Sequence, residues 1–301
     1  MSTFKVMFRR NIKLFFKDKG MFFTSLITPL ILLVLYSTFL SKVYKDSFLM
    51  AIPEGFDVSK KIINGAVGGQ LFASLLAVCC VTVAFCSNML MVQDKVTGAT
   101  KDIGMTPLKR STLALSYYVS TFVSTLIICV VATAACFVYL GVVGWYLSVV
   151  DVIAILLDVI LLTLFGTALS SIINFFLSTQ GQISAVGTVV SSGYGFMCGA
   201  YMPISQFSEG LQRVISFLPG TYGTSLLRNH TMRGALSAMT DEGVPSEVID
   251  GLRDAVDCNL YFFDGKVSVG AMYAVLAVSV FALVGIYVLI NCTLGKRIDK
   301  R

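Results

Sequence analysis

Charged side chains are scarce in this chain. Only 13% of its 301 residues are Asp, Glu, Lys or Arg, whereas soluble domains carry about 25%. Apolar residues account for 56%, which is more than one soluble core can bury. The composition therefore excludes a disordered chain and an ordinary cytosolic enzyme, and it indicates an integral membrane protein.

Residues that commonly act in catalysis or bind metal ions are also scarce. His230 is the single histidine, and no Ser/His/Asp set or G-x-x-x-x-G-K-[ST] phosphate loop is present. The eight cysteines form no CxxC or Cys/His spacing typical of a metal site, and only Cys198 and Cys258 could pair on the non-cytoplasmic side. We therefore expect no catalytic residues, no metal and no cofactor on this chain.

Long apolar runs are abundant. A bilayer core requires about 20 apolar residues per helix, and six stretches qualify. The sequence predicts an all-α integral membrane protein with a single transmembrane domain over residues 1–301. The expected spans are 21–41, 66–92, 113–140, 152–176, 183–203 and 267–292.

The distribution of Lys and Arg predicts the orientation. If the N-terminus is cytoplasmic, residues 1–20, 93–112, 177–182 and 293–301 lie inside and hold 14 of the 23 basic residues. The positive-inside rule then places both termini in the cytoplasm and the protein in the cytoplasmic (plasma) membrane. The net charge of +6 is thus a topology signal, and we expect no nucleic-acid partner.

Residues 3–19 have the pattern of a helix lying on a membrane surface. Aromatic and aliphatic side chains recur on one face, and cations recur on another, which is typical of an interfacial helix on anionic lipid. The alternative is that the cations only set the topology. The candidate lipid-contacting residues are Arg9, Arg10, Lys13 and Lys17.

The cytoplasmic stretch 93–112 carries the first family resemblance. Thr97 to Met105 can form a short helix that Pro107 would end. Asp94, Gly98, Thr106-Pro107-Leu108 and Arg110 stand at the spacing found in the first intracellular loop of type-2 ABC transporter permeases, which this stretch resembles, although Ala99-Thr100 replaces the usual Thr-Leu. An ordinary basic loop is the alternative. The resemblance implies a coupling helix seated on a separate ATPase subunit, with Asp94, Lys95, Gly98, Asp102, Pro107 and Arg110 as coupling residues.

The stretch 204–266 follows the fifth predicted span and is similar to the same family. Pro203-Ile204, Leu211-Gln212, Pro219-Gly220-Thr221-Tyr222 and Arg228 match its outer pattern, although Gly220 replaces a leucine and a second proline near 209 is missing. The pattern predicts a short re-entrant helical hairpin between spans five and six, within an extracytoplasmic helical cap. A hairpin lying flat on the outer leaflet is the alternative.

Several residues inside the predicted spans are candidates for the transport path or a dimer contact. Small residues recur every four positions on span five, which allows helices to approach closely, within the chain or across a dimer. Asp158 is the one acid inside a span, with a structural or a substrate role. The full candidate set is Gln70, Asn88, Asp158, Gly187, Ser191, Gly195 and Gly199.

Taken together, the resemblance implies the permease subunit of an ATP-driven exporter. Its partners would be an ABC ATPase subunit that holds ATP and Mg, a second permease that is identical or homologous, and membrane lipid. The apolar spans favour a hydrophobic or amphipathic cargo such as a drug, antibiotic, peptide or lipid. Two alternatives remain open: a non-transporting membrane sensor or scaffold, and an ion-coupled carrier that uses Asp158.

Overall fold

A computed structural model describes residues 3–52, 58–263 and 265–298. Helices dominate this part of the chain, and its sheet is one antiparallel hairpin of β1 (Leu260–Phe262) and β2 (Gly265–Val267). Five helical segments are long and apolar enough to cross a membrane, which confirms an all-α membrane protein. They are Lys19–Met50, Lys60–Val96, Arg110–Val143, Val149–Phe176 and Val269–Leu294.

The first of these segments is continuous and contains a π-helical turn. Helix α2 (Lys19–Leu35) passes through one π-helical turn, η1 (Tyr36–Leu40), into α3 (Ser41–Ala51). The Asp18 side chain caps α2 by accepting a hydrogen bond from the Met21 amide at 3.1 Å, which satisfies one of the free amides of the first turn.

Helix α4 (Lys60–Val96) is the centre of the molecule. With 37 residues it is about 55 Å long, and it contacts α2, α6 (Arg110–Val143), α7 (Val149–Phe176) and α8 (Gln180–Met197). Its most apolar window is 89% buried, whereas that of the Val269–Leu294 segment is 17% buried. The other helices therefore cover α4 and leave their own apolar faces to the membrane.

Two glycines allow close backbone contacts of α4. A Cβ at Gly69 would lie 2.6 Å from the carbonyl oxygen of Thr231 on α10 (Pro219–Asp241), and one at Gly166 would lie 2.9 Å from the carbonyl oxygen of Cys80. Because no side chain fits at either position, α10 and α7 pack directly against the backbone of α4.

The fifth predicted span differs from the structure at its end. Residues 183–203 were expected to be helical, but α8 ends at Met197 and the chain turns at Gly199, where φ is +72°. Helix α8 has 18 residues and does not appear among the five long apolar segments. A sixth span therefore stays a prediction.

The segment after α8 contains the two helices expected there. A 3-10 turn, η2 (Ile204–Gln206), precedes α9 (Glu209–Ile215), and α10 follows. Pro219 separates the two helices as the first residue of α10, where a missing amide costs nothing. Helix α11 (Ser246–Ala255) then leads to the β1–β2 hairpin.

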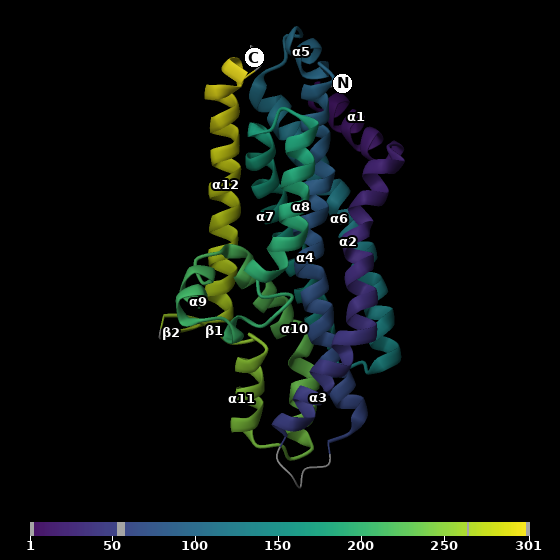
Figure 1. Ribbon diagram of the computed structural model, residues 1–301, viewed down its shortest axis with the longest axis vertical. Coiled ribbons are helices and arrows are strands. Elements are labelled where there is room, and N and C mark those ends of the chain that lie inside the picture. Colours follow the sequence, from purple (N-terminus) through teal and green to yellow (C-terminus); the bar gives the residue numbers. More distant parts are fainter. Residues whose placement is uncertain (1–2, 53–57, 264, 299–301) are drawn as a thin grey trace.

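The two ends of the helix bundle are formed by different segments of the chain. Figure 1 shows α1 (Thr3–Lys17), α5 (Ala99–Gly104) and the C-terminal end of α12 (Val269–Ile298) at one end, with α3 and α11 at the opposite end. The segments predicted to be cytoplasmic thus share one end of the molecule.

Candidate functional site

A large hollow lies between α2 and α8. It has a volume of about 780 Å³, and α4 contributes Cys86, Met89 and Gln93 to its lining. Asp18, Gln93 and Gln180 mark its end near α1 and α5, and Tyr201 lies at its other end. We call this hollow the α2–α8 groove.

The lining of the α2–α8 groove is apolar with hydroxyl groups and almost no charge. Asp18 is the one charged residue among the described lining residues. On α8 the hydroxyls of Thr188 and Ser192 donate to backbone carbonyls four residues earlier, so they present a weakly polar surface. The hydroxyl-bearing residues of the two facing helices are Thr24, Thr28, Ser184, Thr188, Ser191 and Ser192.

Tyr201 closes the groove at the end away from α5. Its hydroxyl donates to the Ser191 carbonyl at 3.1 Å, and its ring meets Phe196 edge-on at a centroid distance of 5.1 Å. The ring rests on Gly195, where an added Cβ would overlap it. Gly195 therefore serves packing within the chain, and its replacement by a larger residue would displace Tyr201.

The other small residues predicted on this helix separate into two groups. Gly187 and Ser191 line the groove. Gly199 lies beyond the end of α8, so it does not share their helix face, and its carbonyl instead accepts a hydrogen bond from Arg228. Of the four small residues predicted to share one helix face, Gly187 and Ser191 line the groove. Gly195 packs against Tyr201, and Gly199 lies in the turn after α8.

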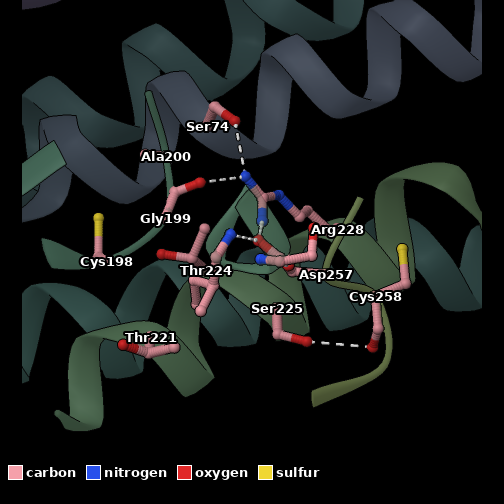
Figure 2. Close-up of polar contacts among 12 residues, drawn as sticks. Ser74, Cys198, Gly199, Ala200, Thr221, Thr224, Ser225, Arg228, Asp257 and Cys258 are labelled. Carbon is pink, nitrogen blue, oxygen red and sulfur yellow. Dashed lines mark hydrogen bonds and ion pairs between the residues drawn. The ribbon is translucent and has the colours of Figure 1, made fainter. Parts of the chain in front are cut away.

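Figure 2 shows the environment of Arg228, which is fully buried on α10. Its guanidinium donates to Asp257 Oδ2 at 2.9 Å, to Ser74 Oγ on α4 at 3.4 Å and to the Gly199 carbonyl. Asp257 also accepts from the Ile204 amide at 2.7 Å. One ion pair thereby ties α4, α10, the turn after α8 and the outer cap together.

Burial of the Arg228–Asp257 pair costs desolvation, and the Nε atom of Arg228 has no hydrogen-bond partner among the described residues. Burial raises the pKa of the Asp257 carboxyl above its ordinary value, while the Arg228 charge and the backbone amides that it accepts from lower it. A buried ion pair of this kind seldom adds much net stability, but removing one partner strands a charge. The pair is therefore a sensitive junction between cap and bundle.

Asp158 lies in a second buried polar cluster. It is fully buried on α7, and it accepts from Tyr273 on α12 at 2.6 Å and meets His230 Nδ1 on α10 at 2.6 Å. It does not reach the membrane surface by extending its side chain. Both oxygens of the Asp158 carboxylate thus have partners within the chain, and these contacts join α7, α10 and α12.

Asn88 and Gln70 are both buried on α4 and are not found among the residues that line the α2–α8 groove. Asn88 donates to Ser170 and Ser171 on α7 and accepts from Thr121 on α6. No hydrogen bond of normal geometry reaches the side-chain nitrogen or oxygen of Gln70 among the described residues, although the Tyr44 side chain lies close to it. The structure therefore places Asn88 in helix packing.

The predicted coupling loop forms a compact turn. Helix α4 ends at Val96, Gly98 takes a left-handed conformation with φ of +83°, and α5 follows. Arg110 then begins α6 after Pro107. The short helix predicted for Thr97–Met105 is confirmed as Ala99–Gly104, and Met105 at its end is 84% exposed.

The base of this loop is fixed to neighbouring helices. Asp94 is buried and accepts two hydrogen bonds from Arg10 of α1, at 2.7 and 2.8 Å, and one from Tyr117. Lys95 donates to carbonyl oxygens at the end of α7, including that of Phe175. Asp94 and Lys95 thus hold the loop in place, whereas Asp102 and Pro107 are exposed at its tip.

Helix α1 forms where a surface helix was predicted, but one of its candidate lipid-contacting cations turns inward. Arg9, Lys13 and Lys17 are exposed, but Arg10 turns inward to Asp94. The hydrogen bonds to Asp94 raise the pKa of Arg10 above its usual value. Met7, Asn11 and Phe15 form the buried face four residues apart, and this face packs on α6 and α4.

Cys198 and Cys258, the one pair that could have bridged, are free and buried. Figure 2 shows them on opposite sides of the Arg228 cluster. Burial raises the pKa of the Cys258 thiol to about 12, so it remains a thiol.

Sequence reasoning missed several of these residues. The hydroxyls at 184, 188 and 192 repeat every four positions, and this period could have identified the groove face of α8. Nothing local marks His230 or Asp257, because their partners lie 72 and 29 residues away along the chain.

Comparison with known protein families matches residues 2–231 to the family described as ABC-2 type transporter. No curated protein sequence matches the chain.

Proposed function

The chain belongs to the ABC-2 type transporter family, and from this premise we propose that it is the permease subunit of an exporter that moves a hydrophobic or amphipathic cargo through the α2–α8 groove. The proposal depends chiefly on the groove itself. It reaches from the end of the bundle that carries α5 to the Tyr201 ring, and it has the volume of a small-molecule site.

The lining of the groove supports the choice of cargo. Apolar side chains such as Ile27, Ile31 and Met89 face hydroxyls that already donate to their own helix. Such a surface stabilises apolar groups by burial and offers only weak polar contacts. A highly charged cargo would lose its hydration there without compensation, so a drug-like, peptide or lipid amphiphile fits better.

A separate ATPase subunit would supply the energy, with ATP and Mg bound on that subunit. The exposed tip of α5 is the part of the loop available to such a partner, while Asp94 and Lys95 connect its base to α1 and α7. Movement of the tip would therefore be transmitted to α1, α4 and α7 together.

A second permease, identical or homologous, would complete the path. The groove is open on the side away from α4, and exposed side chains of α2 and α8 such as Ile27 and Thr188 line it. A facing copy of the same helices would enclose the cargo.

The test is co-purification followed by transport. The tagged chain is isolated from its native membrane with the ATPase subunit that accompanies it, and the complex is reconstituted in vesicles with the α5 end outward. ATP is expected to drive uptake of an amphipathic fluorescent dye, and vesicles lacking this chain serve as control. Absence of an associated ATPase, or uptake equal to the control, would overturn the proposal.

A further inference from the structure

A second hollow lies in the outer cap, well apart from the α2–α8 groove. It has a volume of about 440 Å³ and is bordered by α9, the start of α10, the end of α11 and the β1–β2 hairpin. Its lining combines charged and aromatic side chains. The members that matter here are Glu209, Arg213, Tyr222, Asp254, Tyr261 and Phe263. We call it the outer pocket.

The charges of the outer pocket are of both signs. Glu209 and Arg213 are exposed, and neither has an ion pair or side-chain hydrogen bond within the described residues. Asp254 accepts from Asn259 at 2.7 Å and from Tyr261 at 3.2 Å. With Asp257 neutralised by Arg228, the pocket has two carboxylates against one guanidinium.

The outer rim of the pocket is apolar. Helix α9 turns polar residues such as Gln212 and Arg213 toward the pocket, while Leu211, Val214 and Phe217 are exposed on the other side. Phe217 and the hairpin residues Phe262 and Phe263 form an exposed aromatic cluster with centroid distances of 5.0 to 6.3 Å. A helix that faces water exposes its polar residues and buries its apolar ones, whereas α9 does the opposite.

This rim stands at the level of a membrane interface. The apolar segment Val269–Leu294 begins two residues after β2 ends at Val267, and Figure 1 shows α9 and the hairpin beside the start of α12. Aromatic residues concentrate where membrane spans enter the head-group region. The rim therefore meets lipid, and the outer pocket opens at head-group depth.

We propose that the outer pocket binds the head group of a zwitterionic phospholipid, from the leaflet opposite the α5 end. The ammonium group would be held by Glu209 and Asp254 beside the ring of Tyr261, and the phosphate by Arg213. The acyl chains would lie along Leu211, Val214 and Phe217. Charge-assisted contacts and a cation facing an aromatic ring suit such a head group.

The charge balance decides against an anionic lipid. A phosphatidylglycerol head group offers a phosphate for Arg213 but nothing that pairs with Glu209 and Asp254, so two carboxylates would repel it. Phosphatidylethanolamine carries the same phosphate and adds the missing cation. This inference is independent of the cargo, because the outer pocket and the α2–α8 groove share no described residue.

The test compares the two lipids on the intact complex. The complex is exchanged into mixtures of phosphatidylethanolamine and phosphatidylglycerol with identical chains, and the retained lipid is counted by native mass spectrometry. We expect preferential retention of phosphatidylethanolamine. The Glu209→Gln and Arg213→Gln variants are each expected to lower it roughly tenfold, as for the loss of one charge-assisted contact. Glu247→Gln, on the exposed face of α11, is the matched control.

Three results would overturn the proposal. They are equal retention of the two lipids, unchanged retention in both pocket variants, and displacement of the lipid by soluble phosphoethanolamine at equal concentration. The last result would mean that the head group binds without its chains. Because retention is measured without ATP, failure here leaves the transport test unaffected.

Discussion

At the scale of single residues, the buried charges of this chain find partners on other helices. Arg228 meets Asp257, and Asp158 meets His230 and Tyr273. Each contact joins elements that are distant in sequence. Stability and helix arrangement should therefore respond to changes at these residues more than to changes elsewhere on the surface.

Arg228→Met should destabilise the protein by about 3–5 kcal/mol, because it leaves the buried Asp257 carboxylate without its guanidinium. Arg228→Met with Asp257→Asn should cost less than Arg228→Met alone, since no charge is then stranded. Thermal unfolding of the purified complex gives the comparison, with Lys266→Gln as an exposed control. A single variant as stable as that control would show that the pair is not a junction.

Asp158→Asn should retain ATP-driven transport with the wild-type pH profile over about pH 6 to 8, because the Asp158 carboxylate is occupied by His230 and Tyr273 within the chain. It should also lower stability by about 1–3 kcal/mol through weakened contacts to His230 and Tyr273. The measurement is the transport rate of the variant and of the wild type across that pH range. Loss of pH dependence in the variant would favour an ion-coupled carrier instead.

At the scale of elements, local signals predicted α1 and α5 well, because helical periodicity and a terminating proline lie within those segments. They could not predict where α8 ends, since the turn at Gly199 lets Tyr201 pack on Gly195, a contact between residues on opposite sides of that turn. They also could not assign Asn88 to helix packing, because α4 is apolar on all sides and only the other helices determine which face is free.

Gly98→Val should impair coupling more than folding. A side chain at φ of +83° is strained by about 1–2 kcal/mol, and relief of that strain would reorient α5. Gly104→Ala is the control, because a Cβ there meets nothing within 4 Å. Transport per ATP hydrolysed should fall several-fold in Gly98→Val alone. Equal transport per ATP hydrolysed in both variants would contradict a role for this loop in coupling.

At the scale of the whole molecule, α4 is enclosed on the sides of α6, α7 and α10, and the α2–α8 side remains hollow. In the proposed transporter, this hollow side would face the second permease. Composition predicted a membrane protein, and the basic residues predicted which segments share an end. Neither could predict that the free face belongs to α2 and α8.

Thr188→Cys should therefore form an oxidative cross-link across the permease interface, because this residue is exposed in the groove. Val130→Cys on α6 is the control, with Cys292→Ser as background, since Cys292 is exposed. Gel mobility of the oxidised complex reports the result. Cross-linking through residue 130 but not through 188 would place the interface elsewhere.

The central claim is that cargo moves through the α2–α8 groove, and one measurement addresses it directly. ATP-driven dye uptake is compared between Thr188→Trp, which fills the groove, and Val278→Trp, which adds the same bulk to an exposed position on α12. The account predicts that Thr188→Trp abolishes uptake while Val278→Trp transports as the wild type does. Undiminished uptake by Thr188→Trp would contradict it.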